Sequence, residues 1–192
     1  MDGATVQQRG LVEQARQGDH DAFAMLAGAA IARLDAAARL ILRDRELARD
    51  AVQDALIRAW RDLPGLRDPD RFDAWLHRLT VHACLDVARR RRRRVIEVEL
   101  TPMVAPFVGD TSAMLADREI LDLALRRLEP AWRAVVVMHY YLGMPLPDVA
   151  VELGIPLGTA KSRLHRSLGV MRTTLAESDL GRGLAVPGGQ PA

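Results

Sequence analysis

The sequence predicts an all-α protein made of two small helical domains joined by a flexible linker. Hydrophobic residues, chiefly Ala, Leu and Val, make up 49% of the 192 residues, whereas aromatic residues make up only 4%. This composition favours packed helices over sheets. Apolar residues also recur at helical spacing through most of the chain, and no segment supports a strand.

Four helices are expected in the first half, at about residues 6–17, 21–42, 45–63 and 68–94. Gly18 ends the first, and Asp44 is a suitable N-cap for the third. Pro64 and the glycine after it interrupt the third. The pair Asp68–Pro69 places an N-cap before a proline at the first helical position, so it is expected to begin the fourth.

Residues 95–116 lose helical periodicity and contain two prolines, so we expect a linker there. Further helices are expected at about residues 117–128, 131–142, 147–153 and 156–172. Gly143 should end the second of these, and Gly154 supplies the turn between the last two. The tail, residues 179–192, is expected to be disordered.

The helix expected at 156–172 has two different sides. At about 100° per residue, the apolar side comprises Leu157, Ala160, Leu164, Leu168 and Met171. The opposite side comprises Gly158, Thr159, Lys161, Ser162, His165, Arg166, Gly169 and Arg172. Such a helix suits the DNA major groove, as the second helix of a helix-turn-helix. The alternative is an amphipathic surface helix with a solvated basic face.

The third helix has an unusual polar face, made of Glu46, Asp50, Gln53, Asp54, Ile57 and Arg61. An isoleucine among acidic and amide side chains suggests a protein-docking surface with Ile57 as its apolar anchor. The residues alone favour the simpler alternative, a solvated face with one apolar side chain.

The fourth helix mixes aromatic and cationic side chains on one face, which comprises Trp75, Arg78, His82, Arg89 and Arg93, with Asp86 at its margin. Stacking and phosphate neutralisation by such a face suit a nucleic-acid strand. The six arginines at 89–94 add attraction that does not depend on base sequence. The alternatives are that Trp75 belongs to the core and that the arginines form a solvated helix end or a membrane-surface patch.

The sequence indicates no disulfide, no metal site and no enzymatic site. The single cysteine, Cys84, excludes an internal disulfide, and the five histidines do not converge on one ion. No nucleophile elbow, glycine-rich phosphate loop or paired-carboxylate site is present, so we expect no enzyme, cofactor, metal or small-molecule substrate. Charged residues interrupt the apolar stretch at 23–42, and no signal segment opens the chain, so a cytoplasmic protein without membrane insertion is expected.

Three segments in order resemble bacterial RNA polymerase sigma factors of the extracytoplasmic-function (ECF) group. DAVQDALIRAW at 50–60 is similar to the polymerase-binding part of region 2, and RFDAWLHRLTVHACLDVARRRRRR at 71–94 to the part that melts and reads the minus-ten element. LPDVAVELGIPLGTAKSRLHRSLGVMR at 146–172 is similar to region 4, which reads the minus-thirty-five element. The resemblance implies region 2 at 1–94, a linker at 95–116, region 4 at 117–178 and a tail at 179–192.

The resemblance assigns roles to individual residues. Core-polymerase binding, by the clamp helices of the largest subunit, would involve Asp50, Gln53, Asp54 and Ile57, which replaces the solvated-face interpretation. Minus-ten DNA would be contacted by Trp75, Arg78, His82, Arg89 and Arg93, and the loop at 64–69 would hold a flipped base. Minus-thirty-five DNA would be contacted by Thr159, Lys161, Ser162, Arg163, His165 and Arg166. At His82 the family commonly carries Asn, so minus-ten preference is the part that transfers least.

The resemblance also implies partners beyond the polymerase and promoter DNA. The 22-residue linker spans roughly 25 Å as a coil and about 70 Å when extended. The two domains are therefore expected either to move independently or to fold together. A compact form could hide both DNA surfaces, which implies an anti-sigma factor as a holding partner. The alternatives are a dimeric helix-turn-helix regulator that binds operators and a pure protein-interaction module.

Overall fold

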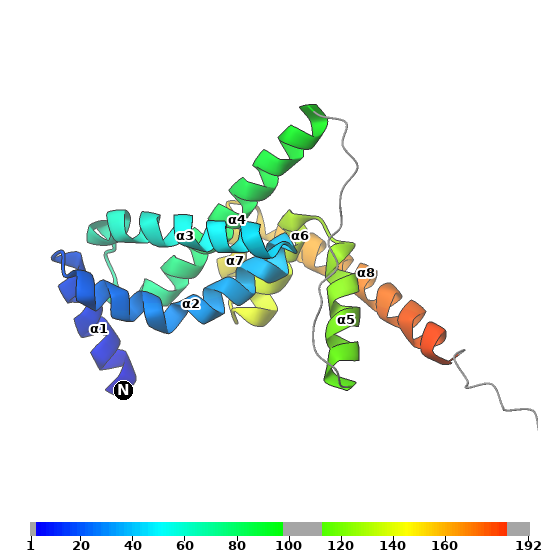
Figure 1. Ribbon diagram of the computed structural model, residues 1–192, viewed down its shortest axis with the longest axis horizontal. Helices are drawn as coiled ribbons and strands as arrows, with labels where there is room; N and C mark the ends of the chain where they lie inside the picture. Colours follow the sequence, from blue (N-terminus) through cyan, green and yellow to red (C-terminus); the bar gives the residue numbers. More distant parts are fainter. Residues whose placement is uncertain (1–2, 98–112, 184–192) are drawn as a thin grey trace, which may run out of the picture.

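The computed structural model describes residues 3–97 and 113–183, and within these ranges it contains helices and turns but no strand (Figure 1). The all-α prediction is therefore confirmed. The N-terminal unit contains α1 (Gly3–Arg16), α2 (His20–Leu42), α3 (Arg45–Asp62), the short 3-10 turns η1 (Leu63–Gly65) and η2 (Pro69–Arg71), and α4 (Phe72–Glu97). The C-terminal unit contains α5 (Ala113–Arg126), α6 (Pro130–Val136), η3 (Val137–Tyr141), α7 (Leu146–Glu152) and α8 (Leu157–Gly183).

Local signals in the sequence set most helix ends. The Asp44 carboxylate accepts a hydrogen bond from the backbone N–H of Leu47 at 3.1 Å, which caps α3 as predicted. Gly143 and Gly154 have φ values of 74° and 63°, a conformation that glycine adopts without strain, and they end η3 and α7. The Asp68 carboxylate caps the turn η2 rather than α4 itself, so the expected fourth helix begins with a 3-10 turn.

Four helices differ clearly from the predicted bounds. α4 continues to Glu97, and α5 begins at Ala113, so both ends of the range expected to be a linker are helical, while 98–112 lies outside the described residues. α8 runs to Gly183, into the predicted tail, of which 184–192 lies outside the described residues. α4 and α8 continue beyond the last residue of the apolar pattern because no proline follows directly to interrupt them. The helix expected at 131–142 changes into the π-helical turn η3 after Val136.

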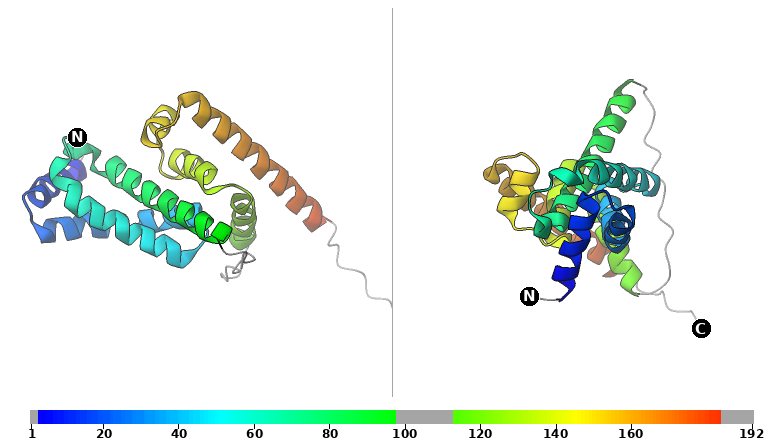
Figure 2. Two further views of the ribbon diagram at one scale, coloured as in Figure 1. Left: turned by 90° about the horizontal axis from the view of Figure 1, so that it is seen from above. Right: turned by 90° about the vertical axis from the view of Figure 1, so that its left-hand side faces the viewer.

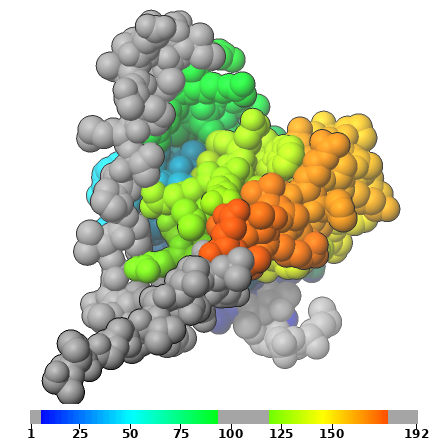
Figure 3. Space-filling model, turned by 90° about the vertical axis from the view of Figure 1, so that its right-hand side faces the viewer, coloured from blue at the N-terminus to red at the C-terminus, as the bar shows by residue number. Residues whose placement is uncertain are grey.

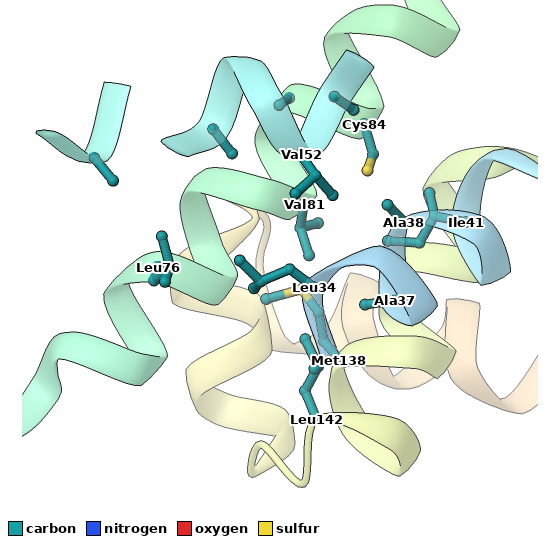
Figure 4. Close-up of a cluster of buried hydrophobic side chains, with 14 of the residues drawn as sticks. Leu34, Ala37, Ala38, Ile41, Val52, Leu76, Val81, Cys84, Met138 and Leu142 are labelled. Atoms are coloured by element: carbon teal, nitrogen blue, oxygen red, sulfur yellow. The ribbon is translucent and has the colours of Figure 1, made fainter. Parts of the chain in front are cut away.

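The two units share one hydrophobic core that is centred on α2. The buried stripe of α2 comprises Leu34, Ala37, Ala38 and Ile41. Figure 4 shows Leu34 close to Val81 of α4 and to Met138 of η3, and all three side chains are fully buried. Leu142, just after η3, extends the same cluster. Of the two expected arrangements, independent or packed together, the structure therefore has the packed one.

Polar contacts connect the two units at the edges of this core. The Arg33 guanidinium of α2 donates hydrogen bonds to the backbone oxygens of Tyr141 and Leu142, both at 3.3 Å. Arg43, just after α2, forms an ion pair with Asp122 of α5, and both side chains are mostly buried. These contacts fix the direction in which the C-terminal unit meets α2.

A smaller apolar cluster joins the helices of the C-terminal unit to one another. Its buried residues are Leu125, Leu128 and Val136, and Trp132 and Met171 pack against them. Figures 1 and 2 show α8 extending past α5 and away from α1. Across residues 3–97 and 113–183, no helix combines the length and apolar character needed to cross a membrane.

The buried cysteine gives a test of the packing of α4. Cys84 is fully buried, and burial raises the pKa of its thiol to about 12. At pH 8 only about one thiol in ten thousand would then be ionised. We expect no measurable reaction with Ellman's reagent in the native protein and one reacting thiol per chain in guanidinium chloride. A fast reaction without denaturant would show that α4 does not stay packed.

Candidate functional surfaces

A groove of about 790 Å³ lies between α2 and α3 and is mostly apolar. Its walls include Phe23, Ile31, Val52, Ile57 and Trp60. Ile57 is 60% exposed, and Ile31 on the opposite wall is also exposed. Large aliphatic side chains in this position are available to a partner that can fill the groove.

The four residues predicted on α3 divide into two pairs. Gln53 and Ile57 line the groove, whereas Asp50 and Asp54 are not among its lining residues. Asp50 is exposed, but the Asp54 carboxylate forms an ion pair with Arg58 at 2.6 Å. The Asp54 carboxylate is therefore already paired with Arg58 within the same helix, and Ile57 is the apolar centre of this surface.

The α2 side of the groove was not predicted from the sequence. The aromatic end of the groove is a cluster in which Trp60 stacks on His20, with ring centroids 4.3 Å apart, and lies 5.2 Å from the ring of Phe23. Ile31 was not predicted as a surface residue because α2 is apolar on more than one side. Periodicity alone therefore could not separate the core stripe of α2 from its groove residues.

On α4, the structure brings Arg78 and His82 together with one residue of the C-terminal unit. The Arg78 Nε atom lies 3.4 Å from a carboxylate oxygen of Glu152. The His82 ring Nε2 lies 2.7 Å from the backbone oxygen of Glu152, so this nitrogen carries the proton and donates. Trp75 is half-buried against the core and near Phe72, with ring centroids 6.0 Å apart, which makes it partly a core residue as the alternative suggested.

The last turns of α4 carry the arginine run beyond the other helices (Figure 1). Arg89 forms an ion pair with Asp86, and Arg91 lies 3.3 Å from Asp44. Burial would raise the pKa of Asp86, but hydrogen bonds from Arg89 and Arg58 outweigh it and lower the pKa. Arg93 is exposed and forms no ion pair with any described residue, so its charge is available to a ligand.

α8 lies at the surface of the molecule (Figure 3, orange). Lys161, Ser162, His165 and Arg166 are exposed, and Thr159 and Arg163 are half-buried. Within the described ranges, Lys161, Arg163 and Arg166 form no ion pair. The expectation that a compact form hides both DNA surfaces is therefore wrong for α8, because the C-terminal unit packs through α6, η3 and α7.

The core side of α8 differs in detail from the predicted apolar stripe. Ala160 is buried, but Leu157 is 39% exposed because it begins the helix directly after the turn. Two polar residues, Ser167 and Thr174, are buried instead, and the Thr174 hydroxyl donates to the backbone oxygen of Val170 at 3.0 Å. In the part of the chain that the structure describes, no group of three or more His, Cys, Asp or Glu side chains could hold a metal ion.

Comparison with known proteins matches both units to one family. Residues 29–94 match Sigma-70 region 2, and residues 118–169 match Sigma-70, region 4. The chain is 34% identical to the RNA polymerase sigma-E factor of Streptomyces avermitilis over 143 residues, which cover 74% of this chain and 79% of that protein. It is 37% identical to the ECF RNA polymerase sigma factor SigM of Mycobacterium tuberculosis over 150 residues, covering 78% and 75% of the two chains.

Two solved structures have a similar fold. CnrH, solved in complex with the cytosolic domain of CnrY, is 28% identical and superposes with a TM-score of 0.63 over 89% of this chain and 98% of that chain. The sigma factor RpoE, solved in complex with the anti-sigma factor NepR from Bartonella quintana, gives a TM-score of 0.70 over 80% of this chain and 96% of that chain. Its sequence identity of 23% supports the fold alone.

Proposed function

This chain belongs to the ECF group of sigma-70 factors and directs transcription initiation, and we propose how its surfaces divide that work. Residues 1–94 would act as region 2 and residues 117–178 as region 4, with no catalytic chemistry in either. The proposal rests on one observation above all. An apolar groove between α2 and α3 and cationic faces on α4 and on α8 occupy separate surfaces, so one chain can hold a protein and two DNA elements together.

The α2–α3 groove would receive the clamp helices of the largest polymerase subunit. Ile57 supports this role because it is an exposed aliphatic side chain with an apolar wall opposite it. Gln53 on the same wall and Asp50 beside it supply polar contacts at the rim, where they orient a partner helix rather than provide most of the affinity.

The minus-ten face, defined as Trp75, Arg78, His82, Arg89 and Arg93, would hold the melted non-template strand. Arginine neutralises phosphates, and the tryptophan ring offers a surface on which a base can stack. Flipping a base costs a few kcal/mol, which such stacking must offset. The arginines at the exposed end of α4 would then follow the duplex next to the melted region.

The exposed face of α8 would contact the minus-thirty-five duplex through Thr159, Lys161, Ser162, Arg163, His165 and Arg166. Its small and cationic side chains allow close approach to the groove and to phosphates. A dimeric operator-binding regulator would use α8 in the same way, but it has no use for the α2–α3 groove or the minus-ten face, so we do not favour it.

A protein partner that restrains the chain is also part of the proposal. CnrH, at 28% identity, was solved with the cytosolic domain of CnrY. An anti-sigma factor of comparable role would act on this chain by keeping its polymerase-binding and DNA-binding surfaces from their targets.

Run-off transcription with sigma-free core polymerase tests the function directly. On a template containing the region upstream of the gene for this chain and other candidate promoters, we expect a discrete transcript only when the protein is added. Absence of a transcript together with absence of core binding in a pull-down would contradict the proposal. It would favour the operator-binding regulator.

Substitution of Ile57 by Arg tests the groove. We expect affinity for core polymerase to fall at least about tenfold, because a charge replaces the apolar anchor of the interface. Val6→Arg is the matched control, since Val6 is also 60% exposed but lies on α1 outside the groove. Asp54→Arg is a poorer test because it would place two cations together at Arg58. Equal binding by the Ile57 and Val6 variants would rule out this docking site.

Substitution of Arg166 by Ala tests α8. If Arg166 contacts a phosphate, the slope of log K against log salt for duplex binding should fall by about 0.9. Arg172→Ala removes the same charge from the same face about 9 Å further along the helix, beyond the proposed contact residues, and should lower the slope less than Arg166→Ala does. Filter binding or fluorescence anisotropy between 50 and 200 mM salt measures both. A smaller effect for Arg166 than for Arg172 would move the DNA contact toward the middle of α8.

A further inference from the structure

Four charged side chains gather where α2 ends and α5 and α6 pack against it, and none of them belongs to the three surfaces proposed above. The cations are Arg43, just after α2, Arg126 in the last turn of α5, and Arg133 of α6. The one anion is Asp122 of α5, which forms ion pairs with Arg43 and, at 2.8 Å, with Arg126. This set, here called the Asp122 cluster, therefore carries three positive charges and one negative charge.

The Asp122 carboxylate does not neutralise the third arginine. Its Oδ1 atom pairs with Nη2 of Arg43, and its Oδ2 atom accepts a hydrogen bond from Nε of Arg126. Arg133 forms no ion pair with any residue that the structure describes, although the charge of Arg43 acts on it from nearby. Two of the three positive charges of the cluster are therefore uncompensated within the described part of the chain.

Arg133 is also the most buried member of the cluster. Its side chain belongs to a residue that is only 8% exposed, and its Nε and Nη1 atoms have no hydrogen-bond partner among the residues described. The Nε atom of Arg43 is likewise buried without a described partner. Buried donors without acceptors are unfavourable, and a buried cation without a counter-charge is more so. The site therefore offers several unused donors around uncompensated positive charge.

The mutual influence of the arginines agrees with this arrangement. Burial and, to a smaller extent, the charge of Arg43 lower the pKa of Arg133 to about 10. Burial and the charge of Arg126 lower the pKa of Arg43 in the same way. A group with a pKa near 10 still keeps its proton at neutral pH, so the cations persist and repel one another.

An oxyanion has the chemistry that this cluster lacks. Guanidinium groups present their N–H donors in a planar fork that matches the oxygens of phosphate or sulfate. A doubly charged ion would balance the two remaining positive charges and accept hydrogen bonds from Arg43 and Arg133. The side chains of Arg126 and Asp122 are 28% and 21% exposed, so solvent and small ions reach the cluster along α5.

We propose that the Asp122 cluster binds a small tetrahedral oxyanion, of the phosphate or sulfate type, through the free donors of Arg43 and Arg133. Arg43 belongs to the N-terminal unit and Arg133 to the C-terminal unit, so the ion binds across their boundary and stabilises the contact between them. The inference does not depend on any of the polymerase-binding or DNA-binding roles proposed above.

The first test is the thermal unfolding of the full chain, followed by far-ultraviolet circular dichroism near neutral pH. Sodium phosphate replaces sodium chloride at constant ionic strength. If phosphate binds with a dissociation constant of about 1 mM, about 10 mM phosphate should raise the unfolding midpoint by about 3–6 °C. Equal midpoints in the two salts would overturn the proposal without the need for any variant.

The second test compares Arg133→Met with Arg172→Met. The first variant removes the unpartnered cation and keeps apolar volume in its place, so its midpoint in chloride should equal or exceed that of the parent. Its response to phosphate should fall below about 1 °C. Arg172 is exposed on α8 and forms no ion pair with any described residue, so its variant should respond as the parent does. An undiminished response of the Arg133 variant would mean general exclusion of phosphate from the protein surface, and the site would be refuted.

Asp122→Asn should act in the opposite direction. Loss of the carboxylate leaves Arg43 and Arg126 without their partner, so the midpoint in chloride should fall. Phosphate would no longer meet a like charge in the cluster, so the rise that it causes should be larger than in the parent. A smaller rise than in the parent would contradict the position of the ion beside Asp122.

Other anions identify the ligand class and its source. Sulfate should act as phosphate does, whereas acetate, which is planar and carries one charge, should shift the midpoint by less than about 1 °C. An acetate response equal to the phosphate response would contradict a site for a tetrahedral ion. A response to adenosine triphosphate that disappears in Arg133→Met would assign the bound phosphate to a nucleotide, and a response to the inorganic ions alone would assign it to the free ion.

Discussion

The buried stripe of α2 is packed from two directions, and the positions of the functional surfaces depend on this double contact. Helices α3 and α4 cover it from the N-terminal unit, while α6 and η3 cover it from the C-terminal unit. Two alanines in the stripe allow the neighbouring helices to approach closely, and Leu34 and Ile41 fill the space at either end. Each large aliphatic side chain buried in this way stabilises the packed arrangement by about 1.5–3 kcal/mol.

The polar contacts around that core have a different effect. The Arg78–Glu152 ion pair is partly exposed, and the Arg43–Asp122 ion pair, although mostly buried, must offset the loss of hydration of its charges. These pairs therefore select the orientation of the C-terminal unit rather than drive its packing. Arg133 of α6 acts in the opposite direction, because it is buried and its Nε and Nη1 atoms have no hydrogen-bond partner among the residues that the structure describes. Apolar burial therefore supplies most of the stability of this interface, the ion pairs specify its orientation, and one unfavourable charge opposes it.

The sequence predicted features whose causes are local and missed those whose causes are distant. The cap at Asp44 and the turn at Gly154 depend on a few neighbouring residues, and the exposed cationic face of α8 depends on spacing within one helix. The contact of Glu152 with His82 joins residues 70 positions apart, and no local pattern indicates it. No groove was predicted. A docking surface was proposed on α3 because that helix has a mixed polar face, whereas the α2 wall of the groove gave no signal because α2 is apolar on several sides.

α4 carries core residues, the minus-ten face and the arginine run on one uninterrupted helix of 26 residues. Side chains on a continuous helix keep a fixed angular phase, and each added residue turns all that follows by about 100° and moves it by about 1.5 Å. Substitutions in α4 can therefore be absorbed one at a time, but an insertion between His82 and Arg89 would turn the arginines away from the side of the helix on which His82 lies. The length of this segment should vary less during evolution than its composition.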